Sequence, residues 1–381
     1  MEEIRRWVPN AVVLACTLGL QWFILQRLLA LGALAARPRL RALAWAGFAA
    51  ASAWMALVVP YLVSHRTQGL SSSAISYLTA ASLFWVLAVL SAAAWLKWAH
   101  PVAFDPSRRH LLALAAPAAA APLVSAGFGA VVARTGMALA EVRLDIRGLP
   151  RDLDGLRIVQ LSDIHFGPFF GPAELRRAVS IANEARPHVA VLTGDLITRR
   201  GDDVDGCLRE LRRLRAEAGV YGCHGNHEFY AGTLEYTTYA GARLGFRFLR
   251  GESAVLRFGS ARLNLAGHDY QRMGARYLPG LERFVEPGAF NLLIQHNPDV
   301  FPRAARAGFH AVLSGHTHGG QINVEILDEN VNVARFFTPF VRGRYDIGPS
   351  RLYVSCGLGT VGVPVRLGAP PEITLVKLCA V

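Results

Sequence analysis

The chain has 381 residues, is 52% hydrophobic and carries a formal net charge of +12. That length accommodates two structural units, and charge divides the sequence in the same way, because residues 1–134 hold 11 of the 40 basic but only 3 of the 28 acidic residues. The basic excess therefore lies beside apolar segments, where membrane topology accounts for it, so it is poor evidence for nucleic-acid binding. The lack of a basic surface interleaved with aromatic residues argues against polymeric nucleic acid.

Four apolar stretches in the first part predict membrane-spanning helices. Each is close to the roughly 20 residues that a span requires, although the first contains Gln21 and the fourth is interrupted by Pro117 and Pro122. A cleaved signal peptide explains the first stretch poorly, because three more stretches follow it. We therefore expect an all-α transmembrane region over residues 1–134 rather than a soluble helical domain. The stretches are residues 7–25, 42–63, 74–96 and 111–133.

The positions of the basic residues predict the orientation of these helices. The loop after the first stretch carries four arginines and the loop after the third carries Lys97, Arg108 and Arg109, whereas the loop between them holds only Arg66. Placing both basic loops in the cytoplasm leaves the C-terminal domain outside it. The loss of one span would move that domain to the cytoplasm.

From residue 135 onward the pattern predicts a soluble α/β domain. Short apolar runs alternate at first with helical segments at 173–185 and 204–216, which favours a sheet covered by helices. The later part has more strands and fewer helices, which indicates a second sheet packed on the first. The strand-like runs are residues 156–161, 189–192, 220–223, 263–266, 292–294, 311–313, 352–355 and 373–378.

Five clusters of His, Asp and Asn follow these runs. One cluster alone is more often a capped turn or a packed histidine, but five in this order are hard to obtain by chance, and the strand ends can bring them to one edge. The clusters are Asp163-Ile164-His165, Gly194-Asp195, Gly225-Asn226-His227-Glu228, Gln295-His296-Asn297 and Gly315-His316-Thr317-His318-Gly319-Gly320-Gln321.

These residue types are the ligands of a two-metal site. Residues two apart in a strand point to the same side, so Asp163 and His165 can chelate one ion, and His316 and His318 share that spacing. Asp195 is a candidate for a carboxylate that bridges both ions. Two ions about 3.5–4 Å apart polarise a phosphate and lower the pKa of a shared water, which gives hydroxide near neutral pH.

The amide oxygen of Asn226 and the imidazole of His296 complete the set of donors. Because imidazole and oxygen donors are mixed, Mn, Fe, Zn or Ni is favoured over Mg, which prefers surroundings made only of oxygen. Ser162 and Thr193 are expected to form hydrogen bonds to ligands rather than to act as nucleophiles.

This order of motifs resembles the calcineurin-like metallophosphoesterase superfamily. The Gly-His-Thr-His-Gly-Gly-Gln segment, followed by Val354-Ser355-Cys356-Gly357-Leu358-Gly359 and Glu372-Ile373-Thr374, is similar to its bacterial YkuE/YaeI-like branch, whose members are often tethered to a membrane. The resemblance covers residue 141 to the C-terminus. It implies a four-layer αββα sandwich over 135–381, preceded by the all-α transmembrane region, in a multi-pass protein of the bacterial inner or cell membrane.

The resemblance also implies a role for each donor. Metal one would be held by Asp163, His165, Asp195 and His318, and metal two by Asp195, Asn226, His296 and His316. His227 would donate a proton to the leaving-group oxygen or stabilise the transition state. Glu228 is expected either to orient His227 or to be a solvated turn residue.

The expected function is hydrolysis of phosphomonoesters or phosphodiesters. A lipid-linked phosphoester is one of the substrates that the sequence allows. One alternative is a pyrophosphatase for a UDP-linked acylated sugar in lipid A synthesis, an activity of some relatives, which requires a cytoplasmic site. Another is a non-catalytic scaffold, but such scaffolds usually lack ligands that are all present here. The aromatic segments 166–172 and 335–340 are expected either to contact an acyl chain or the bilayer interface or to cap the local core.

Overall fold

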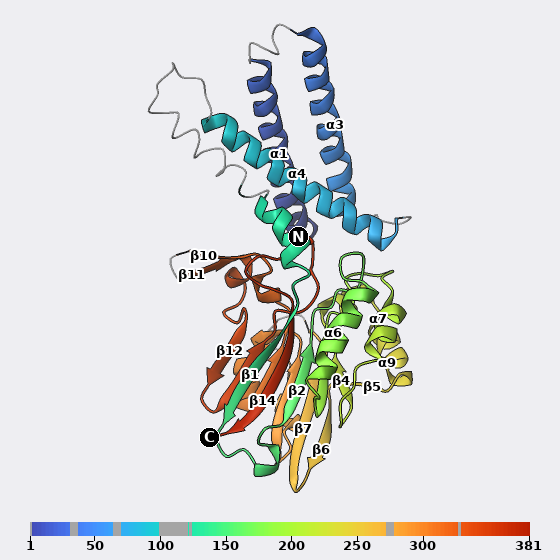
Figure 1. Cartoon of the computed structure of the whole chain (residues 1–381), viewed down its shortest axis with the longest axis vertical. Helices are drawn as coiled ribbons and strands as arrows, with labels where there is room; N and C mark the ends of the chain where they lie inside the picture. Colours follow the sequence, from blue (N-terminus) through green and yellow to red (C-terminus); the bar gives the residue numbers. More distant parts are fainter. Residues whose placement is uncertain are drawn as a thin grey trace. The chain divides into compact units, whose positions relative to one another are not determined.

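The computed structural model describes residues 2–30, 37–63, 70–98, 121, 124–271, 278–326 and 329–381. The chain divides into two compact units, Met1–Phe128 and Gly129–Val381 (Figure 1).

The first unit contains three long helices, α1 (Glu2–Leu29), α3 (Pro38–Val63) and α4 (Ser72–Trp98). Each has a window long and apolar enough to cross a membrane, and at most 22% of any window is buried, so most of these side chains face outward. Three of the four predicted stretches are therefore candidate spans. The fourth, 111–133, lies largely outside the described residues, and its described end belongs to a short apolar helix, Val124–Ala133.

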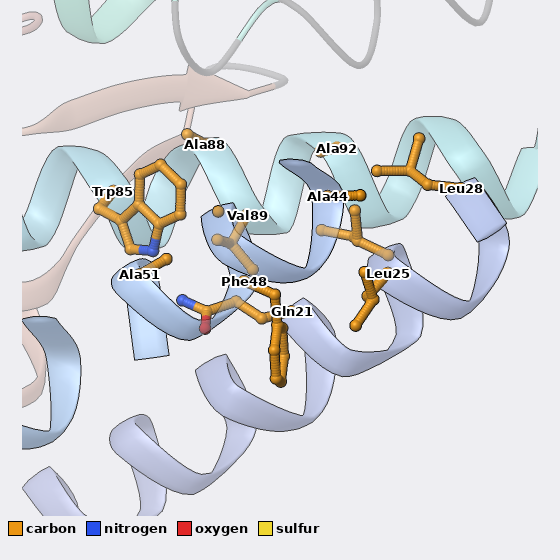
Figure 2. A pocket seen from close by; sticks show the side chains of 12 residues that line it. Gln21, Leu25, Leu28, Ala44, Phe48, Ala51, Trp85, Ala88, Val89 and Ala92 are labelled. Atoms are coloured by element: carbon orange, nitrogen blue, oxygen red, sulfur yellow. The ribbon is translucent and has the colours of Figure 1, made fainter. Parts of the chain in front are cut away.

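A cavity of about 380 Å³ lies among these three helices (Figure 2). Small residues such as Gly47 and Ala51 of α3 and Ala88 of α4 leave this space, and its wall is almost wholly apolar. Gln21 also lines the cavity, and its Oε1 accepts a hydrogen bond of 3.0 Å from Ser52 Oγ. The polar residue of the first stretch is therefore buried within the helices and joins α1 to α3.

The second unit is built on two six-stranded mixed sheets. The first sheet contains, in spatial order, β1 (Ala138–Ile146), β14 (Glu372–Ala380), β2 (Arg157–Leu161), β3 (Val189–Thr193), β4 (Val220–Cys223) and β5 (Phe246–Phe248). The second contains β12 (Gly343–Ile347), β13 (Ser350–Val354), β9 (Ala311–Ser314), β8 (Phe290–Gln295), β7 (Ala261–His268) and β6 (Glu252–Phe258). A hairpin of β10 (Asn323–Ile326) and β11 (Glu329–Asn332) stands apart from both sheets.

Alternation along the strands sends side chains to two different cores. In β2, Ile158 packs between the two sheets, whereas Val159 packs under the helices on the outer face. Those helices are α6 (Pro172–Glu184) and α7 (Val204–Leu211) (Figure 1). On the other side of the molecule, α10 (Phe301–Ala307) packs on the second sheet. These layers form the predicted αββα sandwich.

The sheets position the loops that carry the His, Asp and Asn clusters. Strands β2, β3 and β4 are mutually parallel, and so are β8 and β9. Because the carboxyl ends of parallel strands meet at one edge of a sheet, the loops that follow these five strands gather together. Two short helices, α8 (Asn226–Ala231) and α9 (Leu234–Arg243), follow β4.

Candidate metal centre

All seven predicted metal ligands meet at this edge, in two groups. The first group is Asp163, His165 and His318. Nε2 of His165 lies 3.0 Å from Nε2 of His318, which in turn lies 3.4 Å from Asp163 Oδ1. Because two ring nitrogens and a carboxylate oxygen converge on one point, the group has the form of a metal-binding site.

The second group is Asp195, His296 and His316. His296 Nε2 lies 3.0 Å from Asp195 Oδ2, 3.1 Å from His316 Nδ1 and 3.1 Å from Asn226 Oδ1. Asp195 Oδ2 is also 3.7 Å from His165 Nε2, so this one carboxylate reaches both groups.

The donor set fits divalent cations. Its carboxylates and imidazoles are nearly all buried, and clustered buried groups of this kind need a counter-ion or a metal to offset their desolvation. Without bound metal, burial lowers the pKa of His165 and of His318, and lowers that of His316 to about 4, which keeps these rings in the neutral form that binds metals. Burial opposes ionisation of His296 as well, but the charge of Asp195 raises its pKa to about 10.

His227 lies at the solvent side of the centre. Its Nδ1 is 2.5 Å from the carbonyl oxygen of Thr198, so Nδ1 carries the proton that this bond requires and Nε2 is left for the site. Nε2 lies 4.0 Å from Asp195 Oδ2. A ring nitrogen of His227 also lies within 4.8 Å of His165 and Asp195, so the geometry by itself permits either a ligand or an acid at this position.

Five of the predicted ligand residues have left-handed backbone conformations. The φ angles are 51° at Asp163, 46° at His165, 54° at Asp195, 75° at His316 and 53° at His318. Such angles are costly for residues other than glycine and persist only where surrounding structure imposes them. Asp163 and His165 do lie close together, as their spacing predicted, but the predicted reason is wrong. These residues are not in a strand but in tight turns beyond the strand ends.

Glu228 holds two of these turns together. Its two carboxylate oxygens accept backbone N–H bonds from Asp195 (3.0 Å), Leu196 (2.7 Å), Ile197 (3.2 Å) and Gly225 (2.8 Å). The residue is fully buried. The expectation of a solvated turn residue is therefore wrong, whereas a role in orienting His227 stays a prediction. The bonds of Glu228 fix the backbone of the shared carboxylate Asp195.

Close packing of the ligand loops requires glycine at two positions. A Cβ atom at Gly225 would lie 2.1 Å from Asp195 Oδ1, and one at Gly315 would lie 2.0 Å from Ser162 Oγ. Ser162 Oγ is itself 2.6 Å from Asp163 Oδ2, in agreement with the predicted role of this hydroxyl as a partner of a ligand. Any side chain at either glycine would displace a residue of the centre.

The sequence patterns did not reveal Arg366, which lies behind the centre. This guanidinium is completely buried, donates to the carbonyl oxygens of Gly359, Cys356 and Ala369, and places Nη2 3.4 Å from His318 Nδ1. The sequence does hold one sign of a buried role for Arg366: it is the single charged residue within the otherwise apolar and glycine-rich segment 361–369.

The two aromatic segments differ. Phe166 and Phe170 are buried in the core under α6 and α7, so the first segment caps the core. In the second segment Phe340 packs against Phe301, whereas Phe336 and Phe337 are more than 80% exposed.

Comparisons with known proteins agree with this geometry. A family model for calcineurin-like phosphoesterases matches residues 156–320. A transmembrane protein with a metallophosphoesterase domain from Danio rerio is 32% identical over 270 residues, which cover 67% of this chain and 60% of that protein. The uncharacterized metallophosphoesterase YkuE of Bacillus subtilis is 30% identical over 238 residues, which cover 60% of this chain and 81% of YkuE.

Among solved structures, a phosphopantetheinyl hydrolase from Mycobacterium tuberculosis aligns with a TM-score of 0.35 at 12% identity, over 54% of this chain and 91% of that chain. The chain spans about three-fifths of the length of the Danio rerio relative. With the motifs in order, the two-sheet sandwich and the clustered ligands, the chain belongs to the calcineurin-like metallophosphoesterase family.

Proposed function

We propose that the chain is a membrane-anchored phosphoesterase that hydrolyses phosphomonoesters or phosphodiesters at a two-metal centre. The observation that carries this proposal is the pair of buried His/Asp groups that share Asp195. In this proposal metal one is held by Asp163, His165, Asp195 and His318, and metal two by Asp195, Asn226, His296 and His316.

Two ions of Mn, Fe, Zn or Ni, when bound, supply Lewis acidity and an activated water for attack on phosphorus. The protein supplies their positions and a proton. The bond from His227 Nδ1 to the Thr198 carbonyl holds the ring in place and aims Nε2 toward the centre, where it can pass a proton to the departing ester oxygen. All expected ligands are present, which favours an enzyme over a scaffold.

The test uses the purified full chain with Mn²⁺ and an aryl phosphodiester. Asp195→Ala and His316→Ala should each remove both metal binding and activity. His227→Ala should keep the metal and lose about 10²- to 10⁴-fold in rate, the usual contribution of a positioned acid. His188→Ala, outside the centre, is the matched control. Activity that survives both ligand substitutions would overturn the two-metal assignment.

We also propose that residues 1–134 form a four-span membrane region and that the catalytic domain, residues 135–381, lies outside the cytoplasm. The two basic loops support this side, because loops rich in Lys and Arg stay in the cytoplasm. Alkaline phosphatase fused after Val381 should be active and green fluorescent protein at the same place dark. The opposite pair of results would place the domain in the cytoplasm.

A further inference from the structure

Three aromatic side chains form a cluster beside the metal ligand His316. Phe229 and Tyr230 belong to α8, the helix that also carries His227, and Tyr270 follows β7. The ring centroids of the three lie 5.6, 6.1 and 6.1 Å apart. The Tyr270 ring lies 6.1 Å from the His316 ring, so the cluster begins at the metal centre.

The position of Tyr270 is fixed by the surrounding structure. Its backbone N–H donates to the carbonyl oxygen of His224, at 3.1 Å. The preceding residue, Asp269, accepts a 2.7 Å bond from Arg250 Nε, and Arg250 also pairs with Glu235 of α9 at 2.8 Å. Hydrogen bonds therefore hold the backbone at Tyr270 to the chain that follows β4 and, through Asp269 and Arg250, to α9.

Two of the three aromatic residues are exposed, and Tyr270 is partly buried. Phe229 is 42% exposed and Tyr230 is 56% exposed, even though the three rings pack on one another. The ring planes are inclined to one another by 71°, 59° and 64°, so the rings form an angled surface rather than a parallel stack. The hydroxyls of Tyr230 and Tyr270, 3.4 Å apart, add a polar group to this apolar surface.

An angled aromatic surface with a polar end suits a planar ring better than a flexible chain. A ring can contact aromatic faces and edges in the offset and edge-on geometries that aromatic pairs prefer, and its heteroatoms or substituents can meet the hydroxyls. An alkyl chain gains only apolar contact and loses its own conformational freedom on binding.

We propose that Phe229, Tyr230 and Tyr270 form a subsite that binds an aromatic or heteroaromatic ring on the ester whose phosphate is held at the metals. The subsite rests on the proposed phosphoesterase function and names its substrate class, a phosphoester with an aryl or nucleobase group. Stacking on such a surface contributes roughly 5- to 100-fold in affinity.

Binding of non-hydrolysable phosphonates to the Mn²⁺-loaded full chain in detergent micelles tests this proposal by calorimetry, without need of turnover. Phenylphosphonate should bind about 5- to 100-fold more tightly than methylphosphonate, and more tightly than hexylphosphonate, which has the same number of carbons. Tyr270→Ala should remove this gain while methylphosphonate binds as before. The Tyr270→Phe variant should keep most of the gain in affinity. The Tyr239→Ala variant, which changes an exposed tyrosine of α9 outside the cluster, should bind all three phosphonates as the wild type does.

The same assay identifies the kind of ring and separates the possible failures. Tighter binding of the phosphonate analogue of uridine 5′-monophosphate than of the matching analogue of ribose 5-phosphate supports a nucleobase, and a gain limited to phenylphosphonate supports an aryl group. Equal affinity for phenylphosphonate and methylphosphonate, or hexylphosphonate binding as tightly as phenylphosphonate, overturns the ring subsite while the metal centre stands. Failure of methylphosphonate itself to bind overturns the phosphoesterase proposal beneath it.

Discussion

Replacing Glu228 with glutamine should loosen the turn that carries the shared carboxylate. Each carboxylate oxygen accepts two backbone N–H bonds, one oxygen from Asp195 and Gly225 and the other from Leu196 and Ile197. The amide NH₂ of glutamine must face one of these pairs, so two bonds to a charged acceptor are lost, at about 1.5–3 kcal/mol each.

Part of this loss is recovered. Burial, together with the charge of Asp195, raises the pKa of Glu228, so the carboxylate is itself destabilised in its pocket and the neutral amide relieves that cost. We therefore expect a net local destabilisation of about 2–4 kcal/mol. At about 1.4 kcal/mol for each factor of ten, this corresponds to amide exchange roughly 30- to 700-fold faster in the turn.

Hydrogen exchange followed by mass spectrometry measures this directly in peptides that span residues 194–198, and calorimetry measures Mn²⁺ affinity. Affinity should fall about 10- to 100-fold, as it does when a group that orients a ligand is removed. Glu217→Gln is the matched control, because that side chain is 72% exposed. If Glu228→Gln leaves both exchange and Mn²⁺ affinity unchanged, Glu228 does not hold the turn.

Two further predictions concern the backbone and pH. In metal-free protein, the His316→Gly variant should be more stable than the His316→Ala variant by about 1–2 kcal/mol, because only glycine is relaxed at a φ of 75°. Thermal melts of both variants test this. The same two substitutions at His188 should show the reverse order of stability or no difference. Burial lowers the pKa of His310, whose Nδ1 accepts the N–H of Asn291 at 2.9 Å. Below about pH 6.5, His310 is therefore more protonated in the unfolded chain than in the folded one. The folding stability that neutral His310 permits above that pH is lost as the pH falls. Urea unfolding at pH 7.5 and 5.5 should show a larger loss for the wild type than for His310→Gln, and equal losses would contradict this cause.

The convergence of the candidate metal ligands could be predicted because its signal is local. Each stands a few residues beyond an apolar run, and parallel strands carry such positions to a common edge without further information. Asp163 and Asp195 illustrate this, since each follows a wholly buried strand end in the first sheet. The left-handed turns that aim these side chains had no comparable signal, because aspartate and histidine do not mark such turns as glycine does.

Features that depend on distant contacts could not be predicted. Glu228 acts across two loops that follow different strands, and Arg366 acts on a carbonyl array that only the folded chain assembles. The helix expected over 204–216 ends at Leu211 for a similar reason. Asn183 of α6 bonds to the backbone at Arg213 and Arg215, and so holds the following chain out of helical geometry.

The pairing of β1 with β14 has a consequence for biosynthesis. Strand β14 lies between β1 and β2, so the first sheet joins residues 138–146 to residues 372–380. At about 5–20 residues per second, translation of the intervening chain takes on the order of 10–50 s. During that time β2, and the Asp163 turn beyond it, lack a neighbour on one side. The first sheet therefore closes only after residue 380 has left the ribosome, later in synthesis than the last candidate ligand, His318.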